Sequence, residues 1–110
     1  MKTSAIHFNV ETDDNNIPES ITWSATDKPG ESEAGAVILS VWDRKEGTAL
    51  RIDLWDKKMD VMEMKFFVHQ TLLTLADTFE RATNEKAMSA SLRDFGDYFA
   101  EKMKLGTPLS

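Results

Sequence analysis

Apolar and polar residues alternate through most of the first half of the chain. Alternation places every second side chain on the same face of a strand. The pattern predicts one strand over residues 6–10 and a second over residues 20–25. Between them, residues 11–19 (ETDDNNIPE) are rich in Asp, Asn and Pro, which favour turns. Residues 27–35 (DKPGESEAG) have the composition of a loop.

Residues 36–56 give the most informative pattern. The first part also fits a helix, because Ala34, Val37, Ile38 and Val41 have the spacing i, i+3, i+4, i+7. We favour a strand, since Val, Ile and Trp prefer strands and Gly is a poor helix residue. The following DRKEGT is typical of a hairpin loop, and LRIDLW then alternates cleanly. The segment therefore predicts a β-hairpin.

The second half changes to a helical period. From Asp60 to about Thr83, apolar residues recur along a wide helical face, and Asp60 with Glu63 has the pattern of a capping box. A second helix is predicted to end near Leu105, with Asn84 and Ser89 as rival N-caps. Its apolar positions are Met88, Leu92, Phe95, Phe99 and Met103.

Gly96 stands inside this second predicted helix, where glycine costs about 1 kcal/mol relative to alanine. We expect it to permit close approach of the first helix.

Strands followed by helices predict an α+β fold. We expect a four-stranded antiparallel meander with the two C-terminal helices packed on one face (ββββαα). The 110 residues fit a single domain, 1–110, in which residues 105–110 form a frayed tail.

A short phrase occurs twice in the hairpin, as VWDRK at residues 41–45 and LWDKK at residues 54–58. If Val41 lies opposite Leu50, three aliphatic pairs share one face, where the helices can cover them. The other face then carries Ile38, Ser40, Trp42, Arg51, Asp53 and Trp55. Each copy of the phrase is thus a strand end with its Trp pointing outward.

An outer face with two tryptophans and an isoleucine resembles the exposed apolar patches that often bind partners. The candidate partner-binding residues are Ile38, Trp42, Arg51, Asp53 and Trp55. Two other interpretations stay open. The indoles can fold over their own hairpin, or be covered by residues 27–35 or the C-terminal tail, as ordinary surface aromatics. The face can also hold a small ligand.

Composition and charge narrow the classes of partner. The net charge is −6, and basic residues do not gather in a stripe with aromatics, which argues against nucleic acid. No segment has the ~18 apolar residues of a membrane span, and the N-terminus lacks the apolar stretch of a secretory signal. We therefore expect a cytoplasmic protein without direct membrane insertion.

No catalytic or metal-binding pattern is apparent. The chain has no Cys, and its two histidines, His7 and His69, are not in a metal-binding motif. The DDNN at residues 13–16 lacks the spacing of a calcium loop, and glycine-rich phosphate motifs are absent. We expect no enzyme activity, metal or cofactor. The alternative is a small-ligand or enzymatic module with a pocket between helices and sheet near Asp77, Arg81 and Tyr98.

Several short motifs together resemble one family. They are SVWD (40–43), LRIDLW (50–55), QTL (70–72), ADT (76–78), RAT (81–83), RDF (93–95) and YFAEK (98–102). In this order and spacing they are similar to the gliding-motility protein GldC family, over nearly the whole chain.

The resemblance implies a small accessory factor of the machinery that moves gliding bacteria over surfaces, without a catalytic motif. Its expected partner is a protein of that machinery or another copy of itself. The family's SVWD and LRIDLW include the two outer-face tryptophans with their charged neighbours, which supports the outer face as part of the family's pattern.

Overall fold

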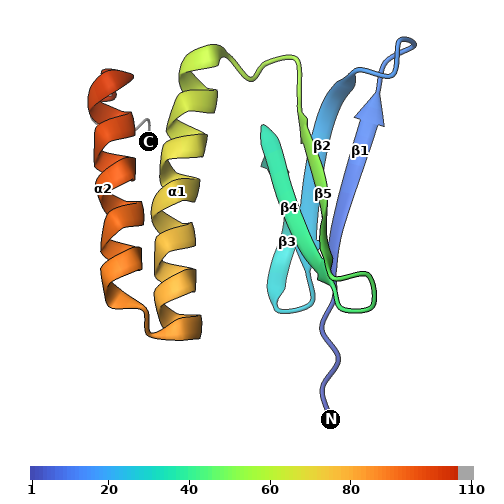
Figure 1. Cartoon of the computed structure of the whole chain (residues 1–110). Helices are drawn as coiled ribbons and strands as arrows, with labels where there is room; N and C mark the ends of the chain where they lie inside the picture. The colour runs from blue at the N-terminus through green and yellow to red at the C-terminus, as the bar shows by residue number, and fades with distance from the viewer. Residues whose placement is uncertain (107–110) are drawn as a thin grey trace. The chain divides into compact units, whose positions relative to one another are not determined.

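The computed structural model describes residues 1–106, which form five strands and two helices (Figure 1). Two compact units, residues 1–59 and the residues from Asp60 onward, are described separately. The elements are β1 (Ile6–Thr12), β2 (Pro18–Ala25), β3 (Lys28–Ala34), β4 (Ala36–Asp43), β5 (Thr48–Trp55), α1 (Val61–Thr83) and α2 (Lys86–Lys102). The α+β class is confirmed. The expected frayed tail falls mainly on residues 107–110, which lie outside the described residues.

The first unit contains two antiparallel sheets, β1-β2-β3 and β4-β5. The prediction of one four-stranded sheet was therefore wrong. Strands β3 and β4 follow each other with only Gly35 between them, but β3 pairs with β2 and β4 pairs with β5. That the helices cover a sheet face stays a prediction.

The strand that the sequence pattern missed is β3, in the segment predicted to be a loop. Its residues KPGESEA contain no large apolar side chain, so alternation gives no signal. Pairing with β2 defines this strand, and the register shifts between Trp23 and Ala25. Pro29 and Gly30, which has a positive φ of 74°, are tolerated because β3 is an edge strand.

The predicted β-hairpin is confirmed, including its register. Val41 lies opposite Leu50, and the pairing runs without a shift from Asp43 and Thr48 to Ala36 and Trp55. The hairpin turn uses Gly47, whose φ of 68° is in the left-handed region that favours glycine. Aliphatic residues on alternate positions share one face: Val37, Leu39, Val41, Leu50, Ile52 and Leu54.

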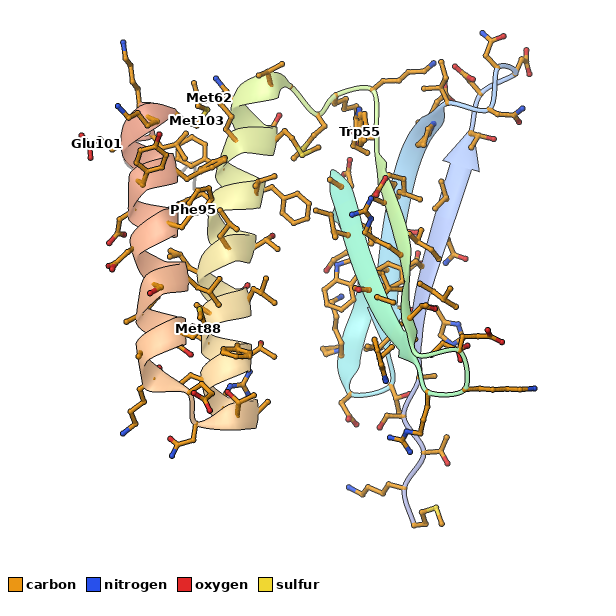
Figure 2. The ribbon with its side chains drawn as sticks, in the orientation of Figure 1. Trp55, Met62, Met88, Phe95, Glu101 and Met103 are labelled. Carbon is orange, nitrogen blue, oxygen red and sulfur yellow. The ribbon has the colours of Figure 1, made fainter. Side chains whose placement is uncertain are left out.

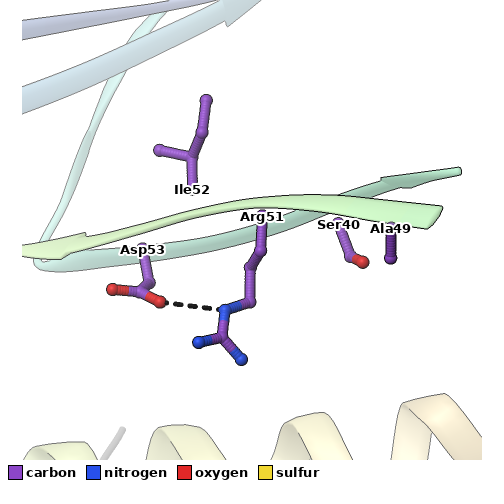
Figure 3. A pocket seen from close by; sticks show the side chains of 5 residues that line it. All are labelled: Ser40, Ala49, Arg51, Ile52 and Asp53. Atoms are coloured by element: carbon purple, nitrogen blue, oxygen red, sulfur yellow. Dashed lines mark ion pairs between the residues drawn. The ribbon is translucent and has the colours of Figure 1, made fainter. Parts of the chain in front are cut away.

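This aliphatic face points toward the other sheet of the unit. Figure 3 shows Ile52 on the side of the hairpin where the three-stranded sheet is drawn. In that sheet Ile21 is completely buried, whereas its cross-strand neighbour Val10 is 38% exposed. Ile52 is 56% exposed, so the cover over the hairpin is incomplete.

Ion pairs with Lys57, just after the end of β5, hold the turn between β1 and β2. The Asp13 carboxylate accepts hydrogen bonds from the backbone N–H groups of Asn15 and Ile17, as expected for a polar turn. It also lies 2.6 Å from Lys57 Nζ, and Glu19 lies 3.1 Å from the same nitrogen. The Lys57 backbone N–H donates to the carbonyl of Pro18 at 3.2 Å.

These contacts predict a pH dependence of stability. The Lys57 ammonium, followed by the Ile17 N–H, lowers the pKa of Asp13 from 3.8 to about 2. Because the pKa is lowered on folding, ionised Asp13 stabilises the fold above pH 3.8, and this contribution is lost as the pH falls toward 2. We expect Asp13→Asn to lower the Tm at neutral pH, with the difference from wild type shrinking below pH 3.8 in thermal unfolding followed by Trp fluorescence. A difference that stays constant down to pH 2 would contradict this assignment.

In the second unit, α1 begins with the predicted capping box. The Asp60 carboxylate accepts a hydrogen bond from the Glu63 N–H at 2.7 Å, and Glu63 accepts one from the Asp60 N–H. Both predicted caps of α2 were wrong. Asn84 instead ends α1 in the left-handed conformation, and Ser89 lies inside α2, where its hydroxyl donates to the Glu85 carbonyl. Helix α2 ends at Lys102, three residues before the predicted end near Leu105.

Small residues line the contact between α1 and α2. Ala76 and Ser89 are completely buried, and Gly96 is buried as well. A Cβ added at Gly96 would lie 2.7 Å from Leu73 Cδ2, too close for an ordinary contact. The expected role of Gly96 in close helix approach is confirmed.

Candidate functional site

The outer face of the β4-β5 hairpin, which we call the tryptophan face, carries the predicted partner-binding residues. It consists of Ala36, Ile38, Ser40 and Trp42 on β4 and Ala49, Arg51, Asp53 and Trp55 on β5. Figure 3 shows Arg51 and Asp53 on the side of the hairpin opposite Ile52. All five predicted residues therefore share one face, which points away from the three-stranded sheet.

The tryptophan face is solvent-exposed. Trp42 is 66% exposed, Trp55 is 55% exposed and Ile38 is 43% exposed. Within residues 1–106, neither indole is buried against its own hairpin or beneath residues 27–35. The interpretation of the two tryptophans as ordinary surface aromatics without a partner stays open beside the binding interpretation.

The repeated Trp–Asp phrase has a structural cause in the turns that follow each strand. Asp43 Oδ1 accepts a hydrogen bond from the Glu46 N–H at 2.8 Å. Asp56, only 4% exposed, accepts hydrogen bonds from the N–H groups of Lys58 and Met59, both at 3.0 Å. Each phrase thus combines an outward Trp with an Asp that closes the next turn.

A shallow hollow of about 630 Å³ lies on the tryptophan face (Figure 3). Its lining includes the short side chains of Ser40 and Ala49, and Arg51 and Asp53 border it. Arg51 Nε and Asp53 Oδ2 are 3.1 Å apart. Their side chains are 68% and 47% exposed, so the pair is well hydrated and contributes little to stability. The groups stay available to a partner.

Sequence reasoning did not identify two residues of this face, Ala36 and Ala49. Ala36 lies directly opposite Trp55, and Ala49 lies directly opposite Trp42. Each indole therefore has a small neighbour across the hairpin. Extending the predicted register by one position at each end, from Val41 with Leu50 and from Val37 with Leu54, would have shown both pairs.

A second hollow, of about 330 Å³, borders the same face. Its lining residues come from the start of β2 and the end of β5: Ile17, Pro18, Asp53, Leu54 and Trp55. Trp55 is labelled near the end of β5 in Figure 2. Apolar surface thus continues beyond the hairpin at this tryptophan.

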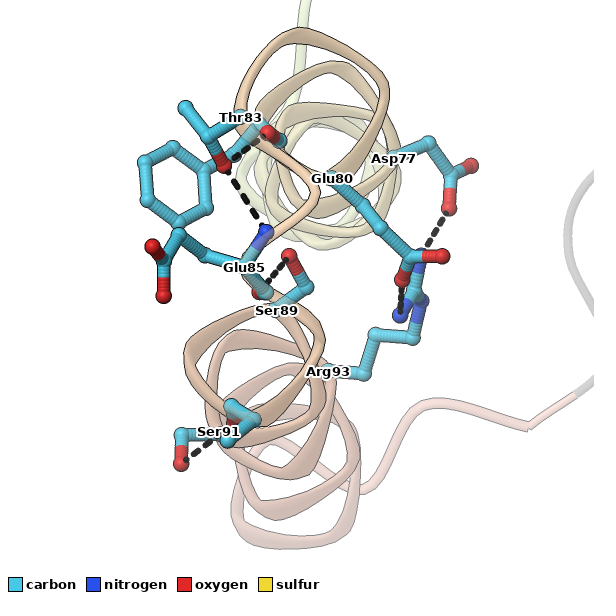
Figure 4. A network of polar contacts seen from close by, with 9 residues as sticks. Asp77, Glu80, Thr83, Glu85, Ser89, Ser91 and Arg93 are labelled. Atoms are coloured by element: carbon cyan, nitrogen blue, oxygen red, sulfur yellow. Dashed lines mark hydrogen bonds and ion pairs between the residues drawn. The ribbon is translucent and has the colours of Figure 1, made fainter.

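The polar residues of the helices form a separate cluster (Figure 4). Arg93 on α2 reaches α1, with its guanidinium 2.7 Å from Asp77 and 2.9 Å from Glu80. These two carboxylates raise the pKa of Arg93 further above its ordinary value. An open hollow of about 360 Å³ is lined by Asp77, Glu80, Arg81 and Arg93.

The ligand-pocket alternative named Asp77, Arg81 and Tyr98. The first two line this hollow, but Tyr98 does not. The Tyr98 ring instead lies 5.9 Å from Phe95, with Lys102 Nζ 5.7 Å from its centroid. The cluster joins the two helices through two ion pairs of Arg93.

Helix α2 also carries apolar side chains that remain exposed. Met88 is 58% exposed, Phe95 is 51% exposed and Tyr98 is 54% exposed. Figure 2 shows Met88 and Phe95 on this helix. These residues lie outside the tryptophan face and were predicted only as part of the apolar stripe of α2.

In the described chain, His, Asp and Glu side chains do not gather in groups of three or more that could hold a metal ion. Through residue 106, neither helix has the length and apolar character needed to cross a membrane.

A family model described as "Gliding motility-associated protein GldC-like" matches residues 18–105. No curated protein and no solved structure gives a significant match. The match covers most of the chain, from the start of β2 to beyond the end of α2, and includes the whole tryptophan face. The chain belongs to the GldC-like family of gliding motility-associated proteins.

Proposed function

We propose that this protein is a non-enzymatic, cytoplasmic accessory factor of the bacterial gliding apparatus that acts by binding through the tryptophan face. Family membership associates the chain with gliding motility. The observation that carries the binding role is the exposure of two indoles and an isoleucine on one face of a short hairpin. Proteins seldom leave such apolar groups together in solvent without a partner for them.

The chemistry of the face supports binding rather than catalysis. Trp is enriched among residues that dominate interface energetics, and Arg51 and Asp53 can orient a partner. Both charged groups already pair with each other in solvent, and neither is held in a buried, water-excluded site. The hollow that these two residues border is open, and its lining residues do not form a nucleophile–base arrangement.

Loss of the two indoles is expected to remove the contribution of this protein to motility. The test replaces the native GldC-like protein of a gliding bacterium with the Trp42→Ser/Trp55→Ser variant and measures colony spreading. We expect spreading to fall to the level of the deletion strain, because the anchors of the interface are gone. Immunoblotting of the cytoplasmic fraction shows whether the variant accumulates normally and where it resides.

Tyr98→Ser is the matched control, since Tyr98 is similarly exposed (54%) but lies on α2. This variant should support normal spreading. Full spreading with the double Trp variant, at normal protein levels, would refute the proposed function.

A further inference from the structure

We infer that the partner of the tryptophan face is a second copy of this chain, stacked face to face about a two-fold axis; this inference rests on the proposed function. The axis runs across the strands, between the row of Ile38 with Asp53 and the row of Ser40 with Arg51. The observation that points to a second copy is that the face is complementary to itself in size and in charge.

The face consists of four rows of directly opposed residues. They are Ala36 with Trp55, Ile38 with Asp53, Ser40 with Arg51 and Trp42 with Ala49. Each outer row pairs one indole with one methyl group, and the two indoles lie at opposite ends of the hairpin on different strands. The two central rows contain one cation and one anion, both on β5.

A two-fold rotation about the stated axis exchanges the rows end for end while keeping each strand over its own counterpart. Trp42 then lies over the second copy's Ala36, and Trp55 lies over the second copy's Ala49. Ile38 lies over the second copy's Ser40. Large side chains therefore meet small ones at these three positions, which is how stacked sheets about 10 Å apart fill the space between them.

The same rotation brings opposite charges together. Arg51 of each copy lies over the second copy's Asp53, which gives two symmetric ion pairs in the centre of the contact. These pairs lie next to the axis, where the twist between stacked sheets displaces residues least. The face has no net charge in a chain whose net charge is −6, so it avoids the repulsion that acidic surfaces would give.

The hollow on the tryptophan face and the area that the face can bury both fit a second copy of the chain. The hollow lined by Ser40 and Ala49 receives Ile38 and Trp55 of the second copy. With 66% and 55% exposure, the four indoles of a dimer bury on the order of 500 Å². The remaining side chains bring the contact near the roughly 1,000 Å² of a small specific interface. A dimer with micromolar rather than nanomolar affinity is expected.

Charge reversal tests the stated geometry. In a dimer of the Arg51→Asp variant, each of the two central ion pairs would become a pair of aspartates. In a dimer of the Asp53→Arg variant, each would become a pair of arginines. We expect sedimentation equilibrium of the full chain to show a wild-type dimer and at least a tenfold rise in Kd for each variant alone. In an equimolar mixture of the two variants, each Asp faces an Arg of the other variant, so the mixture should dimerise at least as well as wild type. The Arg51→Asp/Asp53→Arg variant should likewise recover dimerisation.

Three results would overturn the inference: a wild-type chain that stays monomeric up to millimolar concentration, single variants that dimerise like wild type, or a mixture that stays monomeric. These outcomes are separable from failure of the proposed function. Loss of spreading with the double Trp variant, together with a monomeric wild-type chain, means that the face binds a different protein. Normal spreading with the double Trp variant would refute the proposed function itself.

Discussion

Replacing Ile21 with Ala is expected to lower the free energy of unfolding of the first unit by about 2–5 kcal/mol. Ile21 is the one large apolar side chain that is completely buried among the described residues. Its removal leaves a cavity beneath a sheet whose other apolar residues are partly exposed, such as Phe8 at 42%. Urea unfolding followed by Trp fluorescence measures the change.

Val10→Ala is the matched control, because Val10 is the cross-strand neighbour of Ile21 but is 38% exposed. Since much of its surface already lies in water, we expect a loss of roughly 1 kcal/mol or less. Equal losses for the two variants would show that the core of the first unit does not centre on Ile21.

Replacing Gly96 with Val is expected to destabilise the helical unit by about 1–3 kcal/mol. The first added carbon would already lie 2.7 Å from Leu73 Cδ2, and the two further methyl groups of Val prevent a small adjustment of that side chain from relieving the clash. Gly96→Ala should be nearly neutral, because Leu73 can rotate and alanine gains about 1 kcal/mol of helix propensity. Urea unfolding followed by circular dichroism at the helical band measures both variants.

Ser91→Val is the control for the β-branched side chain itself, since Ser91 is exposed on the same helix. Its cost should be only the small difference in helix propensity, plus the loss of one hydrogen bond to the Ala87 carbonyl. If Gly96→Val and Ser91→Val are equally stable, the close approach at Leu73 has no energetic consequence.

Local pattern predicted the elements in which side-chain periodicity and turn chemistry agree. In the hairpin, alternation sets which residues share a face, and the loop ending in Gly47 fixes the register, so the pairing of Val41 with Leu50 could be read in advance. In α1, the Asp60 and Glu63 pair marks the helix start through contacts only three residues apart. The candidate binding residues follow directly from that register.

Features that depend on distant parts of the chain could not be predicted in this way. Strand β3 has almost no apolar signal, and its extended conformation depends on pairing with β2. Because β3 was not predicted, the division into two sheets at Gly35 was not predicted either. The Lys57 contact with Asp13 joins residues far apart in sequence, where no local spacing indicates a pair.

The most direct test of self-association through the tryptophan face uses the indole N–H signals of the three tryptophans in an NMR titration of the chain from micromolar to millimolar concentration. Trp23 is the internal control, since it is partly buried in the three-stranded sheet with Lys28 Nζ 4.8 Å from its ring. The expected result is that the signals of Trp42 and Trp55 shift together as the chain associates, while that of Trp23 stays in place. Signals of Trp42 and Trp55 that both stay unchanged across the titration would contradict this assignment.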